Sequence, residues 1–311
     1  MSETRAAVQA AGWVGWCCSY CAAPLRPKGA GLVCADEERW FATHEGIHRL
    51  LPEERRREIR PFLELYQRVR RDEGWRAEPG LPDVPPSHPR ARLWRARAAR
   101  FREALAIAAR HLGPAPWHVL EVGAGCCWAS VQMLARGHRV VAVDVNLDPE
   151  DGLVAANRLL PAGAELPRAE ADMEALPLEP GSFDLVLAAG ALHYAQRVTR
   201  TLVELRRVTR RGGLLVIVDS PVFRRRPDGE AMVAERMRRH AELYPPGLPR
   251  ESQSSYLVTG ELAGVFAGAG WRLEVHGWPA PAREWARDLV EIARHGRRTA
   301  RFPILVASRH G

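Results

Sequence analysis

Hydrophobic positions along the chain follow two periods, and the change between them divides the sequence. From about residue 91 to 112 apolar side chains recur every three or four positions, which predicts an amphipathic helix ending before Gly113. Beyond it, short apolar runs alternate with helical stretches. The predicted strands are 118–122, 139–143, 184–189, 214–218, 271–278 and 301–308. This alternation predicts an α/β fold with a mostly parallel sheet, whose ligand binds beyond the carboxyl ends of the strands.

The first ninety residues have a different pattern. Residues 1–50 contain short apolar pieces consistent with small hairpins, and residues 53–75 are strongly charged with apolar positions at helical spacing. We expect Pro61 to lie in the first turn of that helix or to break it. Five prolines within 76–90 predict a stiff linker or surface loop. The predicted parts are a small module at 1–52, a helix and linker at 53–90, and a main domain at 91–311.

The formal net charge of +8 comes almost wholly from arginine, because Lys28 is the only lysine among 311 residues. Such an imbalance is typical of codon bias in a GC-rich genome, so the charge is compatible with RNA or anionic partners without selecting them. No apolar run approaches the roughly 20 residues that span a bilayer, and the N-terminus lacks the regions of a secretory signal. We therefore expect a cytoplasmic protein.

The segment HVLEVGAGCCW, residues 118–128, has the strongest functional pattern. A buried strand leads into Glu121 and then Gly123-x-Gly125, where glycine allows a sharp turn and close approach to a ligand. A dinucleotide fingerprint requires a third glycine where this chain has Trp128. A carboxylate at the strand end also suits an ammonium and sulfonium ligand better than a pyrophosphate.

Two further acidic positions follow in order along the predicted sheet. The strand RVVAVD ends in Asp144, whose carboxylate can accept hydrogen bonds from both hydroxyls of a ribose. Asp172-Met173 then precedes the strand that begins near Phe183. A single Gly-x-Gly is a weak signal, whereas three acidic termini in this order predict a nucleoside site.

These motifs resemble the class I S-adenosylmethionine-dependent methyltransferases of the type found in quinone biosynthesis. The resemblance covers about residues 92–220 and rests on VLEVGAG, VVAVD, ADMEALPL, GSFDLVLAAGALHYA and ELRRVTRRGGLLVIVD. It implies a Rossmann-like, mostly parallel sheet of seven strands with an antiparallel last strand, and S-adenosylmethionine as cofactor. The chain departs from the family at Cys127, where glycine is frequent, and we expect this side chain to narrow the loop without abolishing binding.

The resemblance also implies roles for individual residues. Glu121, Gly123 and Gly125 would line the methionine end of the cofactor. The remaining implied contacts are Asp144 at the ribose, Asp172 and Met173 at the adenine, and Ala189 and His193 near the transferred methyl group, and Val145 is a further cofactor-binding residue.

Cys18-x2-Cys21 followed by Cys34 has the half-site spacing of a zinc ribbon. With GIHRLL after it, the module resembles the ribbons that precede some methyltransferases, including bacterial ribosomal-RNA guanine enzymes. Those ribbons have a fourth ligand three or four residues after the third cysteine, where this chain has Glu37 and Glu38. Three interpretations stay open. The fourth ligand is Cys17, His44 or Glu38; or a metal-free ribbon is held by Trp40, Phe41 and Leu50; or the cysteines are reactive thiols.

Methyl transfer from a sulfonium is an in-line displacement that needs a base only when the acceptor must lose a proton. His193 and Tyr194 are the candidate catalytic residues, and shaping of the cofactor pocket is the alternative role. An insertion at about 221–258 is expected to select the acceptor. Its candidate residues are Asp219 at its start, Arg224, Arg225 and Arg226 for an anion, and Met232, Met237, Tyr244 and Tyr256 as a lid.

Three functions fit these patterns. We favour a methyltransferase acting on a small-molecule acceptor. An RNA methyltransferase is the first alternative, based on the ribbon and the charge, and a non-catalytic cofactor-binding partner subunit is the second. Binding of RNA with steep salt dependence would distinguish the first alternative.

Overall fold

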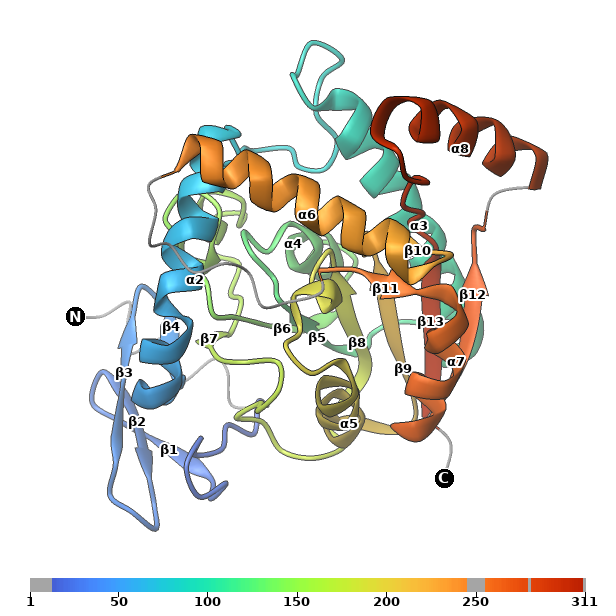
Figure 1. Ribbon diagram of the computed structural model, residues 1–311. Coiled ribbons are helices and arrows are strands. Elements are labelled where there is room, and N and C mark those ends of the chain that lie inside the picture. Colours follow the sequence, from blue (N-terminus) through green and yellow to red (C-terminus); the bar gives the residue numbers. More distant parts are fainter. Residues whose placement is uncertain (1–12, 245–254, 279–280, 310–311) are drawn as a thin grey trace.

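The computed structural model describes residues 13–244, 255–278 and 281–309. One mixed sheet of eleven strands lies at its centre, in the order β1-β2-β3-β4-β7-β6-β5-β8-β9-β13-β12 (Figure 1). These strands are β1 (Leu25–Lys28), β2 (Gly31–Cys34), β3 (Trp40–His44), β4 (Ile47–Arg49), β5 (His118–Val122), β6 (Arg139–Asp144), β7 (Arg168–Glu170), β8 (Phe183–Ala189), β9 (Thr209–Val218), β12 (Trp271–His276) and β13 (Ile304–Arg309). A separate parallel pair consists of β10 (Val222–Phe223) and β11 (Leu257–Val258).

Helices cover both faces of the sheet and its carboxyl edge (Figure 1). They are α2 (Glu53–Asp72), α3 (Ala91–Leu112), α4 (Trp128–Leu134), α5 (Val198–Val208), α6 (Arg226–Leu243), α7 (Thr259–Gly268) and α8 (Pro281–His295), with the short 3₁₀ helices η1 (Leu153–Arg158) and η2 (Leu192–Tyr194). The predicted helix at 91–112 is confirmed as α3. The six predicted strands correspond to β5, β6, β8, β9, β12 and β13.

The main domain contributes seven strands. β7, β6, β5, β8 and β9 run parallel to one another, and β13 is antiparallel to both of its neighbours, β9 and β12. All seven residues of β8 are buried, as expected for a parallel strand covered by helices on both faces. The carboxyl ends of β7, β6, β5 and β8 therefore lie side by side at one edge, where the sequence places its acidic termini.

The N-terminal strands correct the expected size of the sheet. A sheet of seven strands was predicted with a separate module in front, but β4 pairs in parallel with β7, from Ile47 opposite Arg168 to Arg49 opposite Glu170. Without β4, β7 would be an edge strand with unpaired backbone groups. Phe41 and Leu50 join the same hydrophobic core as the central strands. The N-terminal module and the main domain thus share one sheet and one core.

Helix α2 and the segment after it also differ from expectation. Pro61 lies inside the 20-residue helix α2, neither in its first turn nor at a break. Pro61 removes one backbone hydrogen bond from the helix. Side chains on both sides of Pro61 bind the edge of the sheet, as described below, and these contacts offset the loss. Residues 76–90 form turns, and Ala77 and Leu81 are buried against the core that contains Trp94. The segment is packed against the protein and does not act as a free spacer.

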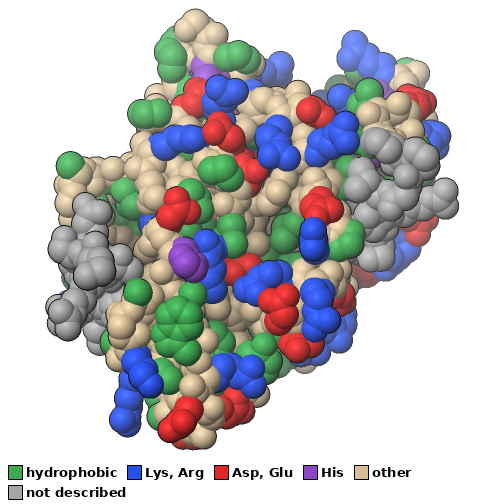
Figure 2. Space-filling model, turned by 90° about the vertical axis from the view of Figure 1, so that its left-hand side faces the viewer, with side chains coloured by type: hydrophobic (Ala, Val, Ile, Leu, Met, Phe, Trp, Pro, Cys, Tyr) green, Lys and Arg blue, Asp and Glu red, His purple; other side chains and the backbone are tan. Residues whose placement is uncertain are grey.

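Within the described residues, no helix is both long enough and apolar enough to cross a membrane. On the face shown in Figure 2, which carries the side of the molecule with β1–β4 and α2, basic and acidic side chains are interspersed. That face therefore has no continuous basic stripe of the kind that tracks a nucleic-acid backbone.

Candidate functional site

The loop between β5 and α4 has the backbone shape that a tight ligand loop needs. Gly123 and Gly125 have φ values of 61° and 51°, in the left-handed region. A Cβ atom at Gly123 would also lie 2.4 Å from the Cβ of Ala191, so a larger residue cannot fit. Cys127 is left-handed as well (φ 61°) and is fully buried at the N-cap of α4. Glycine would adopt this left-handed conformation more readily than cysteine does.

Glu121 lies buried beneath this loop. One carboxylate oxygen accepts hydrogen bonds from the backbone N–H of Ser130 (2.7 Å) and from its hydroxyl (2.5 Å), in the first turn of α4. Burial raises the pKa of Glu121 to about 7, although the two hydrogen bonds oppose the shift. The carboxyl group therefore exchanges a proton near neutral pH, and a cation placed beside it would favour its ionised form.

This shift predicts a pH dependence of stability. The pKa of Glu121 is about 7 in the folded protein and near 4.5 in the unfolded chain. The contribution of Glu121 to the free energy of unfolding is therefore fully present below pH 4.5 and is lost as the pH rises through 7. The free energy of unfolding should therefore be lower above pH 7 than below pH 4.5 by roughly 3 kcal/mol. Urea unfolding of the wild type and of Glu121→Gln, measured every half unit of pH, should show the wild type losing stability relative to the variant as the pH rises. A difference that does not change with pH would contradict this assignment.

Asp144, at the end of β6, holds the same loop from the neighbouring strand. Its carboxylate accepts hydrogen bonds from the backbone N–H of Gly125 (2.6 Å) and of Asn146 (2.7 Å). Burial raises its pKa to about 6. Val145 follows it and is half-buried. The structure thus brings the glycine loop and the second acidic terminus into direct contact.

The third acidic terminus has a partner that was not predicted. Asp172 accepts a hydrogen bond from the backbone N–H of Glu174 (2.9 Å) and forms an ion pair with the Arg55 guanidinium of α2 (2.6 Å). Met173 beside it is half-buried, and Ala189 is buried at the last position of β8. Arg55 therefore lies at the predicted adenine position.

Arg55 belongs to a row of contacts that holds α2 across the carboxyl ends of β6 and β7. The others are Arg56 with Glu170 (2.9 Å), Gln67 with Asn146 (2.9 Å) and Arg70 with Asp151 (2.6 Å). The high charge of residues 53–75 signalled an ionic role, but the partners lie 79 to 117 residues away in sequence. Sequence reasoning therefore missed α2 as a wall of the site.

His193 and Tyr194 follow β8 in the short helix η2. His193 Nδ1 lies 3.2 Å from the hydroxyl oxygen of Ser220, which follows the end of β9. Burial, together with the positive charges of Arg236 and Arg97, lowers the pKa of His193 to about 3. The imidazole is therefore neutral at physiological pH and is a weak base. Tyr194 makes an edge-on contact with Tyr66 of α2, with ring centroids 5.6 Å apart.

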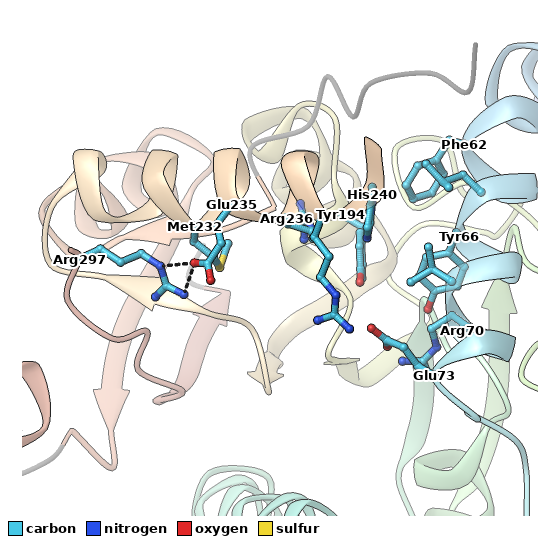
Figure 3. Close-up of a pocket in the computed structure, with 13 residues that line it drawn as sticks. Phe62, Tyr66, Arg70, Glu73, Tyr194, Met232, Glu235, Arg236, His240 and Arg297 are labelled. Carbon is cyan, nitrogen blue, oxygen red and sulfur yellow. Dashed lines mark hydrogen bonds and ion pairs between the residues drawn. The ribbon is translucent and has the colours of Figure 1, made fainter. Parts of the chain in front are cut away.

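A cavity of about 350 Å³ lies between α2, η2 and α6 (Figure 3). Its size is at the lower end of the range of small-molecule sites, about 300–1,000 Å³. Tyr194 lines it, so it begins next to the end of β8. Of the predicted acceptor-selecting residues only Met232 lines this cavity; Arg226 and Tyr256 line a different one beside α5 and α7. Arg225 and Arg226 instead form ion pairs with Asp228 and Glu261.

Asp219 was expected near the acceptor, and its side chain is 4% exposed between two arginines of α3, Arg97 and Arg100. Its contacts therefore join α3 to the end of β9. No described contact places it in the cavity.

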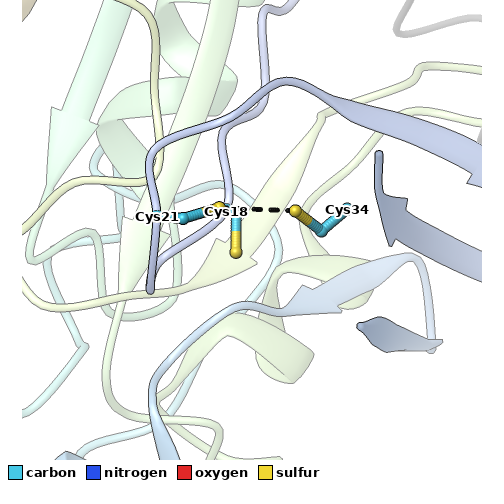
Figure 4. A group of neighbouring side chains, drawn as sticks. All are labelled: Cys18, Cys21 and Cys34. Carbon is cyan, nitrogen blue, oxygen red and sulfur yellow. Dashed lines mark hydrogen bonds between the residues drawn. The ribbon is translucent and has the colours of Figure 1, made fainter. Parts of the chain in front are cut away.

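The cysteine cluster is a second candidate site. The Sγ atoms of Cys18, Cys21 and Cys34 all lie within 4.8 Å of one another, and Cys21 and Cys34 are 3.4 Å apart (Figure 4). Four thiolates about 2.3 Å from a tetrahedral zinc ion are roughly 3.8 Å apart, so three of the positions fit a zinc site.

None of the three residues considered as a fourth ligand belongs to this cluster among the described residues. Cys17 pairs with Pro24 in the backbone, and adjacent residues of an extended chain point to opposite sides. His44 and Glu38 are exposed. Trp40 is 54% exposed, and its Nε1 donates a hydrogen bond to the backbone oxygen of Lys28 in β1 (3.3 Å), whereas Phe41 and Leu50 are buried.

Comparison with known proteins shows similarity to methyltransferases over part of the chain. Residues 120–217 match the sequence family described as "Methyltransferase domain". An uncharacterized protein of Mycobacterium tuberculosis is 44% identical over 95 residues, which are 30% of this chain and 34% of that protein. A malonyl-[acyl-carrier protein] O-methyltransferase of Methylococcus capsulatus is 35% identical over 36% of this chain and 41% of its own length. A demethylmenaquinone methyltransferase of a Mycobacterium species is 28% identical over 58% of this chain and 74% of its own length.

The similarity is therefore confined to part of each chain, and the first of these relatives matches over about a third of its length. A crystal structure from Bacillus halodurans, described as that of a candidate methyltransferase, superimposes with a TM-score of 0.50 at 17% identity. It covers 68% of this chain and all of the other. The chain thus has the Rossmann-like fold of class I methyltransferases. Residues 120–217 are similar in sequence to methyltransferase domains.

Proposed function

We propose that the protein transfers a methyl group from S-adenosylmethionine to a small-molecule acceptor. The observation that carries this proposal is that Glu121, Asp144 and Asp172 lie at or just beyond the carboxyl ends of the adjacent parallel strands β5, β6 and β7, and that Asp144 also binds the glycine loop. The size of the cavity beside Tyr194, about 350 Å³, favours a small acceptor over RNA.

The residues present fit the cofactor in chemical type. Glu121, Gly123 and Gly125 would hold the methionine end, since a carboxylate with a pKa near 7 ionises readily beside an ammonium group. Asp144 and Val145 would hold the ribose, Asp172 and Met173 the adenine, and Ala189 would lie near the methyl group. Asp172 forms an ion pair with Arg55 of α2. We therefore further propose that the Arg55 side chain moves away from Asp172 when the adenine binds.

When bound, S-adenosylmethionine supplies an electrophilic methyl group. The acceptor's lone pair would bond to this methyl carbon, and the electrons of the broken carbon–sulfur bond would remain on the sulfur. The protein's part is to hold the acceptor in line and to exclude water. His193 is too weak a base to take a proton in this step, so we assign it to shaping the pocket. Tyr194 positions the acceptor as part of the cavity wall.

We also propose that Cys18, Cys21 and Cys34 bind a structural zinc ion. Such an ion would stabilise the N-terminal module and would take no part in methyl transfer, because this module extends the sheet by pairing β4 with β7. The proposed boundaries are residues 1–52 for this module, 53–90 for the helix and the segment after it, and 91–311 for the methyltransferase domain, with the insertion at about 221–258.

Titration of the full-length protein with S-adenosylmethionine and S-adenosylhomocysteine by calorimetry tests the cofactor assignment. We expect one site per chain for each ligand. Incubation with methyl-labelled S-adenosylmethionine and pooled small-molecule acceptors should then transfer label to a low-molecular-mass product. Absence of binding by both ligands would refute the proposal, and binding without transfer to any acceptor would favour a non-catalytic partner subunit.

A further inference from the structure

The cavity between α2, η2 and α6 has an aromatic wall. Phe62 and Tyr66 project from α2 toward Tyr194 of η2, as Figure 3 shows. Ring centroids are 5.6 Å apart for Tyr66 and Tyr194, 5.9 Å for Phe62 and Tyr66, and 6.3 Å for Phe62 and Tyr194. Three aromatic rings at such separations form an apolar surface against which the body of a small ligand can pack.

Arginines outnumber acidic side chains in the lining of the cavity, but two of them have carboxylate partners. Arg70 forms an ion pair with Asp151 at 2.6 Å. Arg297 binds the carboxylate of Glu235 with two nitrogens, at 3.1 and 3.0 Å. These ion pairs compensate the charges of both guanidinium groups.

The other two arginines of the lining, Arg236 and Arg239 of α6, are not free charges inside the cavity. Arg236 has an interaction partner, and Figure 3 shows the Glu73 carboxylate beside its guanidinium group. Arg239 is exposed, so water hydrates it. A charged ligand group would therefore meet no uncompensated opposite charge in the described lining, and burying it there would be costly. The lining favours an uncharged ligand.

Tyr66 contributes a hydroxyl group to this cavity. Its side chain is half-buried and lines the cavity. Among the described residues its contacts are made by the ring, with Phe62, Tyr194 and Arg70, and none is a hydrogen bond of the hydroxyl. Tyrosine hydroxyl groups that are withdrawn from bulk water usually have a hydrogen-bond partner. A ligand in the cavity can supply the partner of this one.

The Tyr66 hydroxyl also lies toward the cofactor loop. Burial raises its pKa well above the ordinary range, and the carboxylates of Asp151 and Asp144 act in the same direction. Asp144 binds the glycine loop, and Tyr194, which contacts Tyr66, follows the end of β8. The hydroxyl therefore keeps its proton at neutral pH and lies within electrostatic reach of the predicted ribose position.

We propose that Tyr66 positions the methyl acceptor, and that its hydroxyl forms a hydrogen bond to a polar atom of an uncharged molecule whose apolar part packs against Phe62 and Tyr194. This hydrogen bond holds the polar atom at the end of the cavity next to the cofactor site, where its lone pair can be aligned with the methyl group. Because the phenol keeps its own proton, Tyr66 is a positioning residue and not a base. The inference rests on the proposed function and names the acceptor class of the same site.

Four probes, titrated into the full-length protein saturated with S-adenosylhomocysteine, test the proposal. Benzyl alcohol is uncharged and has a hydroxyl group, toluene lacks the polar atom, and benzoate and benzylamine carry opposite charges. We expect benzyl alcohol to bind about 5-fold more tightly than toluene, because one neutral hydrogen bond contributes roughly 1 kcal/mol. Both ions should bind more weakly than benzyl alcohol. Nuclear magnetic resonance of the probes measures the four affinities.

A single substitution isolates the hydroxyl from the ring. Tyr66→Phe should lower the affinity for benzyl alcohol to that for toluene and leave the affinity for toluene unchanged. Tyr20→Phe is the matched control, because Tyr20 is 40% exposed and does not line the cavity. It should retain the preference. A purely structural role of Tyr66 would not change the ratio of the two affinities, and both variants should bind S-adenosylhomocysteine like the wild type.

The outcomes distinguish this inference from the function on which it rests. The inference is overturned if benzyl alcohol does not bind, if toluene or either ion binds as tightly, or if Tyr66→Phe keeps the preference for the alcohol. Weaker binding of S-adenosylhomocysteine by folded Tyr66→Phe also overturns it, because the hydroxyl then serves the cofactor. Failure of the wild type to bind S-adenosylhomocysteine overturns the proposed function itself.

Discussion

Replacing Asp144 with alanine should weaken S-adenosylmethionine binding by about 100-fold, because two charge-assisted hydrogen bonds to ribose hydroxyls contribute roughly 1.5 kcal/mol each. The carboxylate also accepts hydrogen bonds from the backbone N–H groups of Gly125 and Asn146. Its removal therefore loosens the glycine loop as well as deleting a ligand contact. Calorimetric titration with S-adenosylmethionine measures the effect directly.

The control for this prediction is Glu165→Gln, which neutralises an exposed carboxylate of the same domain. It should bind the cofactor like the wild type. Thermal unfolding of both variants separates loss of affinity from loss of fold. If folded Asp144→Ala binds within about threefold of the wild type, the ribose assignment of Asp144 is wrong, since one hydrogen bond to a charged group is already worth more than that.

The second large effect concerns the proposed zinc ion. Cys34→Ala should lose the metal and lower the melting temperature by roughly 10 °C, because a structural zinc ion contributes several kcal/mol to folding. Cys34 is 1% exposed and lies in the core shared by the N-terminal strands and the main sheet. The loss of stability should therefore affect β7 of the main sheet as well as the module, because β7 pairs with β4.

Cys17→Ala is the matched control, because Cys17 is a buried neighbour of Cys18 that does not belong to the cluster. It should retain the metal. Metal analysis by mass spectrometry should give one zinc ion per chain for the wild type and for Cys17→Ala, and close to none for Cys34→Ala. A wild-type protein that neither contains zinc nor takes it up from solution would exclude the metal site.

Much of the cofactor loop was predictable from sequence because its requirements are local. Gly123 and Gly125 are needed by the left-handed backbone of a single turn, and Glu121 and Asp144 each end a buried strand. The order of such elements along the chain is enough to align their carboxyl ends in a parallel sheet.

The acceptor cavity was not predictable in the same way. Tyr66, Tyr194 and Arg236 come from segments that have no common motif, and they meet only because α2 and α6 lie over the same edge of the sheet. The sequence directed attention to Arg225 and Arg226, which form ion pairs elsewhere. A run of arginines predicts positive charge, but the direction of each side chain depends on helix α6, which begins at Arg226.

Pro61 and the N-terminal strands provide two further contrasts. Local rules place a proline at a helix start or break, yet α2 continues because Arg55, Arg56, Gln67 and Arg70 bind the main domain on either side of it. Likewise, the hairpins of residues 25–44 were predictable from short apolar runs, whereas the pairing of β4 with β7 joins residues about 120 positions apart.

The sequence by itself thus determined the alternating strands and helices, the glycine loop, the acidic termini and the spacing of the three cysteines. Each of these depends on backbone geometry or hydrophobic period within a short segment. Only the tertiary structure decided that the cysteine-bearing module extends the main sheet, that α2 places Arg55 against Asp172, and that an aromatic and basic cavity forms beside Tyr194. These features depend on contacts between distant segments, whose partners are selected by packing and charge across the whole fold.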